Sequence, residues 1–342
     1  MKAAQLHSLA DIEIVDTPVP EIGEHEALVR MRACGICGSD TMEWYVKKKA
    51  PFFLGHEPAG VIEKVGRNVT QFKQGDRVFV HHHAPCFDCK FCRKKQYALC
   101  AAWKATNLAP GGMAEFFRVP EINLHGDMLL LPESFSFEDG SLIEPVACVV
   151  KSMRKANLQP QDSLLVIGLG VMGQMHVLLA RHAGVHQIIG ADRVPYRLNK
   201  AREFGANMVV DVTREELPEA VRQATDGDLA DVVIVGPGTT SAMATAMKCV
   251  GKGGTVLFFT PAPDGELLSI HPFHLYFNEI NLLFSYSCGP DDTREAMALI
   301  EQGIINAEKL VTHRYPLEKI REAVDNTIKA GESLKTLVVC QS

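Results

Sequence analysis

The sequence predicts an α/β protein that combines a doubly wound parallel sheet with a second, β-rich, barrel-like domain. From residue 151 to residue 287, short apolar segments alternate with helical segments, as parallel strands and their crossover helices do. Residues 1 to about 80 instead hold short strands with period-two alternation, separated by glycines and prolines. We therefore expect two domains, one of residues 151–287 and the other of residues 1–150 with 288–342.

The elements follow from hydrophobic periodicity. In the sheet domain, apolar segments predict strands at 164–167, 187–192, 207–211, 231–235, 254–259 and 280–285. Helical periodicity lies between them, for example at 195–204 and 239–250. In the barrel-like domain, we expect strands at 27–33, 78–80, 114–119, 312–316 and 334–340, and helices that begin near 138 and 292. Right-handed crossovers then make one sheet, whose ligands bind at the carboxyl ends of its strands.

Composition excludes several classes of protein. The chain has 342 residues and a net charge of −6, which gives no electrostatic basis for binding nucleic acid. Its apolar runs fall far short of the roughly 20 residues that a membrane-spanning helix needs. Asp11, Glu13 and Asp16 interrupt any apolar core of a signal peptide, so we expect a cytoplasmic protein. Ten cysteines in such a protein indicate metal ligands rather than disulfides.

Three glycines that follow an apolar segment and open a helix predict a dinucleotide site. Gly168 permits the tight turn, Gly170 leaves room for a pyrophosphate, and Gly173 lets the helix approach the strand. The helix N-terminus offers free N–H groups to the phosphates. At the end of the next strand, Asp192 can accept hydrogen bonds from both ribose hydroxyls of NAD. Arg193 could hold the extra phosphate of NADP, but Asp192 would repel it, so NAD is favoured.

A cysteine cluster predicts a closed metal site. Its members, at two-two-seven spacing, are Cys86, Cys89, Cys92 and Cys100. Four thiolates at this spacing can surround one tetrahedral Zn²⁺ and stabilise a lobe that has little core of its own. An iron–sulfur cluster fits less well, because no proline follows the last cysteine and the spacing differs from that of ferredoxins. Since protein fills all four positions, we expect this metal to be structural rather than catalytic.

Further candidate ligands are scattered along the chain. Cys37, His56 and Glu57 are of types that suit Zn²⁺, although each alone also fits a buried cysteine or a surface turn. Glu144 lies in an apolar helical run, where a carboxylate has to be paired or metal-bound. A salt bridge or a place at a metal would both satisfy it. We interpret the three histidines at 81–83 as a strand end with partly exposed imidazoles rather than as ligands.

Together, these motifs resemble the zinc-dependent medium-chain dehydrogenase/reductase family, which includes alcohol dehydrogenases, over essentially the whole chain. Within the family they are most similar to the polyol branch typified by sorbitol dehydrogenase, with threonine dehydrogenase as a close relative. The residues that follow the family's zinc signature are Gly55, His56, Glu57, Gly60, Gly66 and Val69. The resemblance implies a GroES-like barrel domain that carries the structural zinc lobe, and a Rossmann domain that binds the cofactor.

The resemblance also implies roles for individual residues. The implied ligands of a catalytic zinc are Cys37, His56 and Glu57, with Glu144 bound to the zinc directly or through water. Ser39 corresponds to the hydroxyl that relays the substrate proton, and Asp40 to the acid that orients His56. The implied cofactor positions are Gly168, Gly170, Met172, Gly173, Asp192, Arg197, Phe259, Thr260 and Ser285. Each chain would then hold two zinc ions and one NAD.

The implied activity is the reversible oxidation of a secondary alcohol, polyol or sugar-like, to a ketone by hydride transfer to NAD. Two positions depart from the polyol branch: Met42 and Glu43 replace a His-Tyr pair, and Ser285 replaces an arginine. The substrate is therefore not fixed by the resemblance. An amino-alcohol dehydrogenase of the L-threonine type is one alternative, with Glu43 facing the ammonium group. A zinc-free quinone reductase and a catalytically silent NAD- or zinc-binding sensor are the others.

The resemblance also implies that the protein is a homo-oligomer. Members of the family are dimers or tetramers, commonly through the sixth strand of the cofactor domain. The apolar residues 282–284 in that strand are compatible with such an interface, and equally with ordinary burial.

Overall fold

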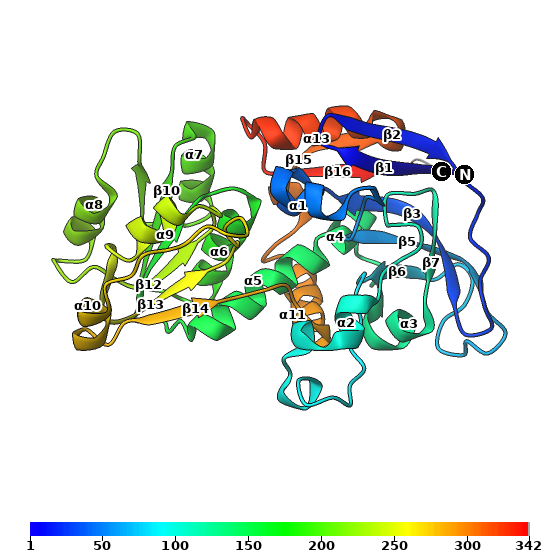
Figure 1. Ribbon diagram of the computed structural model, residues 1–342, viewed down its shortest axis with the longest axis horizontal. Helices are drawn as coiled ribbons and strands as arrows, with labels where there is room; N and C mark the ends of the chain where they lie inside the picture. The colour runs from blue at the N-terminus through cyan, green and yellow to red at the C-terminus, as the bar shows by residue number, and fades with distance from the viewer. Residues whose placement is uncertain (341–342) are drawn as a thin grey trace. The chain divides into compact units, whose positions relative to one another are not determined.

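The computed structural model describes residues 1–340 and separates the chain into two compact units (Figure 1). One unit comprises Met1–Ala147 together with the chain from Cys288 onward, and the other comprises Cys148–Ser287. The expected division at residue 150 lies inside α5 (Ile143–Ala156), the helix with which the chain leaves the first unit. Within the described residues, no helix is long and apolar enough to cross a membrane.

The unit Cys148–Ser287 contains a parallel six-stranded sheet with the order β11-β10-β9-β12-β13-β14. Its strands are β9 (Ser163–Ile167), β10 (Gln187–Asp192), β11 (Met208–Asp211), β12 (Ala230–Val235), β13 (Val250–Phe258) and β14 (Asn281–Phe284). Its helices are α6 (Val171–His182), α7 (Pro195–Glu203), α8 (Leu217–Ala224), α9 (Thr240–Ala246) and α10 (Pro272–Phe277). Because the strand order reverses between β9 and β12, the sheet is doubly wound, as the sequence predicts.

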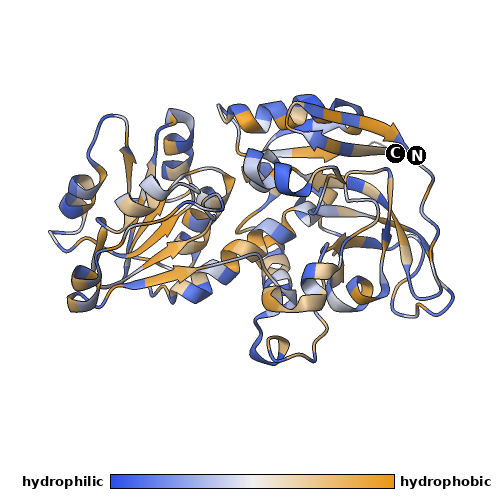
Figure 2. Cartoon of the chain, in the orientation of Figure 1, coloured by the Kyte–Doolittle hydropathy of each residue, from blue (hydrophilic) through white to orange (hydrophobic). Residues whose placement is uncertain are grey.

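The strands of this sheet are apolar because helices cover both faces of a doubly wound sheet. Figure 2 shows them as largely hydrophobic. The expected helix at 239–250 is too long, since α9 ends at Ala246 and Val250 already pairs with Ala230 of β12. Periodicity could not place this boundary, because a short apolar segment fits a strand as well as a buried helix.

The other unit is built around antiparallel strands. Its strands are β1 (Lys2–Ser8), β2 (Asp11–Asp16), β3 (Ala27–Gly35), β4 (Phe52–Phe53), β5 (Pro58–Val65), β6 (Arg77–Val80), β7 (Phe116–Val119), β8 (Met128–Leu130), β15 (Val311–Pro316) and β16 (Lys335–Val339). In its described part, a seven-stranded sheet has the order β15-β16-β3-β5-β6-β8, with β7 also paired to β3, and a smaller sheet has the order β2-β1-β4. The core between them includes Val29, Met31 and Phe117, which are all fully buried.

Short helices connect these strands. They are α1 (Glu43–Lys49), α2 (Ala101–Ala105), α3 (Glu121–Asp127), α4 (Phe137–Ser141), α11 (Pro290–Glu301), α12 (Ala307–Leu310) and α13 (Ile320–Lys329), with 3₁₀ turns η1 (Gly38–Thr41), η2 (Cys92–Lys94), η3 (Tyr97–Leu99) and η4 (Leu317–Lys319). The helix expected from residue 138 is divided into α4 and α5. The Ser136 hydroxyl accepts a hydrogen bond from the N–H of Asp139, and this cap sets the start of α4.

Candidate active site and metal centres

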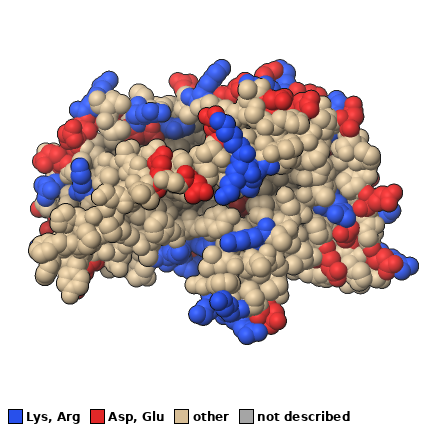
Figure 3. All heavy atoms as spheres, viewed as in Figure 1, with Lys and Arg blue, Asp and Glu red and all other residues tan. Residues whose placement is uncertain are grey.

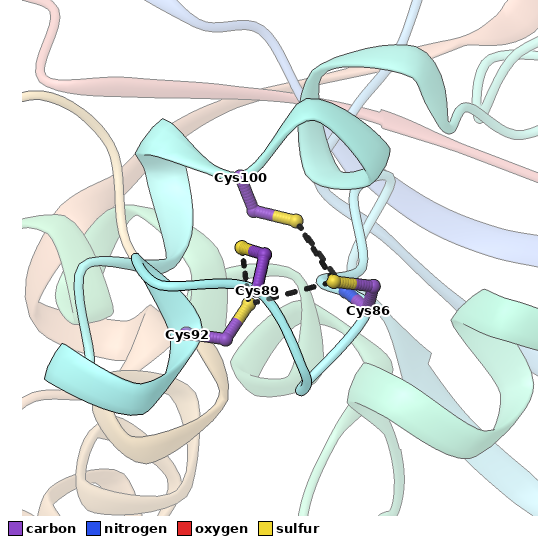
Figure 4. Close-up of side chains that lie close together, drawn as sticks. All are labelled: Cys86, Cys89, Cys92 and Cys100. Carbon is purple, nitrogen blue, oxygen red and sulfur yellow. Dashed lines mark hydrogen bonds between the residues drawn. The ribbon is translucent and has the colours of Figure 1, made fainter.

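The four clustered cysteines converge on one point. Their sulfur atoms lie within 4.8 Å of one another, and neighbouring sulfurs are 3.5 to 4.0 Å apart (Figure 4). Sulfurs at about 2.3 Å from a tetrahedral Zn²⁺ are separated by roughly 3.8 Å, whereas a disulfide brings them to about 2 Å. The lobe has only a small core around Trp103 and Tyr97. Its sulfurs therefore have the spacing of a closed tetrahedral metal site.

A second group forms where two paired strands end. Cys37 follows β3, and His56 and Glu57 precede β5. The two strands are antiparallel with Cys34 opposite Pro58, so the register brings these segments side by side. The thiol of Cys37, a ring nitrogen of His56 and a carboxylate oxygen of Glu57 lie within 4.8 Å of one another. These three donors leave a tetrahedral metal one open position, as a catalytic zinc requires.

Asp40 lies behind the ring of His56. Its carboxylate is buried, accepts a hydrogen bond from the N–H of Cys37 at 3.1 Å, and approaches Nδ1 of His56 to 3.7 Å. Burial lowers the pKa of His56, but the charges of Asp40 and Cys37 outweigh it and raise that pKa well above its ordinary value. A metal binds only the neutral imidazole, so its binding here would release a proton.

Glu57 is also paired with a buried lysine. Its Oε2 lies 2.5 Å from Nζ of Lys335, and both side chains are only 1% exposed. Lys335 donates a further hydrogen bond to the carbonyl of Ile36 at 3.0 Å. Burial lowers the pKa of Lys335, but the charges of Glu57 and Cys37 raise it overall. Oε1 of Glu57 is buried without a hydrogen-bond partner among the described residues, which fits a metal ligand.

Glu144 belongs to a third group, with His81 and Cys288, whose candidate ligand atoms also lie within 4.8 Å of one another. The structure therefore does not place Glu144 within the group of Cys37, although it lies within electrostatic reach of it. Burial and the charge of Glu57 raise the pKa of Glu144, while His56 lowers it. The helical run is apolar around this carboxylate because nearly every residue of α5 from Ile143 to Val150 is buried.

The expectation of partly exposed imidazoles at residues 81–83 is wrong for His81, which is fully buried. Pairing of β6 with β8 continues one residue further, where the N–H of His81 donates to the carbonyl of Asp127. The carboxylate of Asp127 lies 2.9 Å from Nδ1 of His81, and this contact compensates for the burial of the imidazole ring. His82 and His83 remain half-buried, and Nδ1 of His82 has no partner among the described residues. Burial lowers the pKa of His83 to about 3.

The glycine turn has the geometry of a phosphate cradle. Gly168 has a φ of +87°, which favours glycine, and a Cβ on Gly173 would lie 2.1 Å from the carbonyl oxygen of Gly168. A Cβ on Gly170 would meet nothing closer than Arg197, at 3.8 Å. Nε of Arg197 is buried and has no partner among residues 1–340. A donor without a partner beside an open turn at a helix N-terminus fits a dinucleotide phosphate.

Asp192 ends β10 beside this turn. Its Oδ2 accepts the N–H of Leu169 at 2.7 Å, and its Oδ1 accepts those of Arg193 and Val194 at 2.7 and 2.9 Å. These bonds fix the carboxylate, and a carboxylate with about four acceptor positions retains one for a ribose hydroxyl. The side chain of Arg193 is exposed.

The remaining predicted positions lie around the same edge of the sheet or near Cys37. Met172 is in the first turn of α6, Phe259 and Thr260 follow β13, and Ser285 follows β14. The hydroxyl of Ser285 is buried without a partner in the described chain. Ser39 is half-buried in η1, two residues after Cys37.

Several residues of these groups were not predicted. Lys335 could have been noticed as a single cation in the apolar strand 334–340. The sequence around Asp127 and Cys288 does not mark either residue, because each contacts His81 only in the folded chain. His81 stands in a run of three histidines, and the sequence does not show which of the three is fully buried.

Comparisons with known proteins agree with this geometry. Residues 23–128 match the family model "Alcohol dehydrogenase GroES-like domain", and residues 171–302 match "Zinc-binding dehydrogenase". A sorbitol dehydrogenase of Bacillus subtilis is 32% identical over 350 residues, covering 99% of this chain and 97% of that protein.

Solved structures are similar over both chains. A zinc-binding dehydrogenase of Sinorhizobium meliloti bound to NADP is 28% identical, with a TM-score of 0.90 and 99% of each chain covered. The 2R,3R-butanediol dehydrogenase of Bacillus subtilis is 26% identical, with a TM-score of 0.87 and the same coverage. The chain therefore belongs to the zinc-dependent medium-chain dehydrogenase/reductase family, in its polyol branch, and is a zinc-dependent, NAD(P)-linked alcohol oxidoreductase.

Proposed function

We propose that this enzyme oxidises a secondary alcohol of the polyol or sugar-alcohol type to a ketone, reversibly and with NAD as the hydride acceptor. The observation that carries the proposal is the convergence of Cys37, His56 and Glu57, with Asp40 behind the imidazole. A zinc ion held by these three side chains would supply the Lewis acidity that eases loss of the proton from the alcohol. Two relatives in the comparison, a sorbitol and a butanediol dehydrogenase, are named for alcohols of this kind.

Residues of this chain orient the metal ligands and transfer the proton of the alcohol. Asp40 keeps the His56 ring facing the metal position, as outer carboxylates do for histidine ligands. The Ser39 hydroxyl, two residues after Cys37, accepts the substrate proton and passes it to the cofactor ribose or to solvent. Glu144 acts beside the metal, either as a ligand or through a water molecule.

A second zinc, in the cysteine lobe, has a structural role only. All four of its positions would be filled by the thiolates in Figure 4, so substrate has no access to it. The lobe has little core of its own, so metal binding there contributes to its folding. We therefore expect two zinc ions per chain, with different chemical accessibility.

NAD is the proposed cofactor, rather than NADP. The Asp192 carboxylate is fixed by backbone N–H groups next to the glycine turn, where its charge would repel a 2′-phosphate. Arg193, on the adjacent exposed position, is the residue that could favour NADP instead. The ratio of kcat/KM for the two cofactors tests this choice, and a ratio that favours NADP would contradict it.

An L-threonine dehydrogenase would share the metal and cofactor motifs, but the position of Glu43 argues against this residue as the partner of a substrate ammonium group. The side chain lies on α1, is 70% exposed and forms an ion pair with Lys47 at 2.7 Å. The hydrogen bond from Lys47 lowers the pKa of Glu43. A carboxylate that is solvated and already paired is poorly suited to select an ammonium substrate.

Turnover assays distinguish the substrate classes directly. NADH formation is followed with polyols, sugar alcohols, vicinal diols, simple secondary alcohols and L-threonine, and zinc is measured on the same enzyme sample. We expect the highest kcat/KM for a polyol or diol. A preference for L-threonine would reject the substrate assignment and leave the metal and cofactor assignments in place.

We further propose that two copies of the chain associate through β14 and α10. β14 is the last strand of its sheet, so one edge lacks a partner strand within this unit. The side chains of Phe273, Tyr276 and Phe277 on α10 and of Phe284 at the end of β14 are 65% to 77% exposed. Figure 3 shows few charged side chains over α10. A second copy presents the same edge and the same apolar patch, and can cover both by antiparallel pairing about a twofold axis.

A further inference from the structure

The mechanism above gives no role to His81, which lies in one buried group with Glu144 and Cys288. His81 is fully buried in the first unit, and both of its ring nitrogens face protein atoms. Nδ1 lies 2.9 Å from Oδ2 of Asp127, and Nε2 lies 3.6 Å from the thiol of Cys288. A carboxylate oxygen of Glu144 lies within 4.8 Å of a ring nitrogen of His81 and of the thiol of Cys288. The ring thus lies between a fixed acid and the thiol of Cys288, and the Glu144 carboxylate is close to both the ring and the thiol.

The acid that holds His81 is itself held. The second oxygen of Asp127 accepts a hydrogen bond from the Thr293 hydroxyl at 2.5 Å, and Arg294 approaches it to 3.6 Å. The N–H of His81 donates to the carbonyl of Asp127 at 3.1 Å, and the amide of Asn123 donates to the carbonyl of His81 at 3.1 Å. Backbone and ring of His81 are therefore anchored to α3 and α11 and have little freedom to rotate.

The cysteine lobe holds the remaining partner in place. Tyr97 of the lobe packs on Gly289, where an added Cβ would lie 2.5 Å from the tyrosine ring. Lys95 of the lobe forms an ion pair with Asp291 at 2.9 Å. These contacts fix the segment between Cys288 and Thr293, which contacts His81 and Asp127 at its two ends.

We propose that His81 is a positioning residue that holds the Glu144 carboxylate at the catalytic metal centre, with Asp127 and Thr293 as its anchor. The proposal rests on the role proposed above for Glu144. Carboxylates at a metal are commonly oriented by the groups that contact them from outside the ligand set. Here the pair of His81 and Asp127 orients a carboxylate of α5, so that the helix, the lobe and α11 together determine where Glu144 points.

The test measures metal retention, which a general loss of packing would not change selectively. His81→Leu, Asp127→Asn, Glu144→Gln and the double variant His81→Leu/Glu144→Gln are loaded with zinc, and release to a chelator is followed with a colorimetric indicator. The lobe zinc in the same molecule is the internal control. Cys249→Ala, at an equally buried cysteine of the other unit, controls for the effect of altering a buried side chain.

We expect Glu144→Gln to release one zinc per chain about tenfold faster than the unaltered enzyme, the low end of the usual effect of groups around a metal. His81→Leu should reproduce most of that increase, and the double variant should release zinc no faster than Glu144→Gln alone. Asp127→Asn keeps the side-chain size and should give a smaller increase of the same kind. Release of the lobe zinc should stay unchanged in all of them.

Other results reject the proposal for identifiable reasons. Wild-type release from both His81→Leu and Asp127→Asn, or a double variant whose effects multiply, would show that His81 does not act through Glu144. Unchanged release and turnover in Glu144→Gln would instead reject the proposed function of Glu144. A third zinc in the unaltered enzyme, lost in Cys288→Ser, would show that His81, Glu144 and Cys288 bind a cation of their own.

Discussion

Lys335→Met replaces a buried ammonium by an apolar side chain of similar length and leaves the Glu57 carboxylate without its partner. The two charged groups are 2.5 Å apart and 1% exposed. At an effective dielectric constant of about 20, such charges attract by roughly 7 kcal/mol, of which desolvation of the ammonium offsets a part. Removing one partner of a buried pair costs about 3–5 kcal/mol, so we expect a loss of this size in the free energy of unfolding.

Urea unfolding followed by tryptophan fluorescence measures this loss, because the signal comes from the structural unit that contains the pair. Both tryptophans of the chain, Trp44 and Trp103, lie in the unit that contains Lys335. Lys2→Met is a matched control, because Lys2 and Glu318 form a pair at 2.9 Å whose side chains are 44% and 55% exposed. Such an exposed pair contributes about 0–1 kcal/mol.

The double variant Lys335→Met/Glu57→Gln separates the ion pair from packing. It removes both charges, so it should recover most of the stability that Lys335→Met loses. A loss below about 1 kcal/mol in Lys335→Met, or a double variant no more stable than the single one, would refute the buried ion pair as we describe it.

Three further predictions concern other parts of the molecule. Cys100→Ser should lower zinc content by one ion per chain and destabilise the lobe, whereas full zinc content by mass spectrometry would contradict the closed site. Burial lowers the pKa of His176 from 6.5 to about 4, so unfolding takes up a proton between these pH values and stability falls as pH falls, by up to about 1.4 kcal/mol per pH unit. His176→Gln should flatten this part of the pH profile in urea unfolding followed by circular dichroism, and an equal slope in both proteins would contradict the assignment. Phe277→Asp should halve the molar mass in light scattering, and an unchanged mass would reject the β14 interface.

The local motifs could be predicted because they need few tertiary contacts. The turn at Gly168 and the spacing of the lobe cysteines are each contained in a short segment, and the chemistry restricts which residues fit. The alternation of strands and helices likewise predicted a doubly wound parallel sheet through general connection rules, and the structure has such a sheet.

The buried partners of Glu57 and His81 could not be predicted from local patterns. Lys335, on β16, contacts Glu57. Cys288 contacts His81 and is separated from it in the sequence by the whole of the other unit. Such contacts depend on the register of strands that are distant in sequence, which a pattern along one strand does not encode. Glu43 shows the opposite case. It lies close to the Cys37 motif in the sequence, but in the structure its side chain is solvated on α1.

Zinc content and turnover measured together on Cys37→Ala test the central claim most directly. Cys34→Ala, at a buried cysteine three residues earlier that belongs to no candidate metal group, is the matched control. The unaltered enzyme and Cys34→Ala should each bind two zinc ions and reduce NAD with a secondary alcohol. Cys37→Ala should retain one zinc and lose turnover, whereas Cys37→Ala with two zinc ions or with unchanged turnover would contradict a catalytic metal at Cys37, His56 and Glu57.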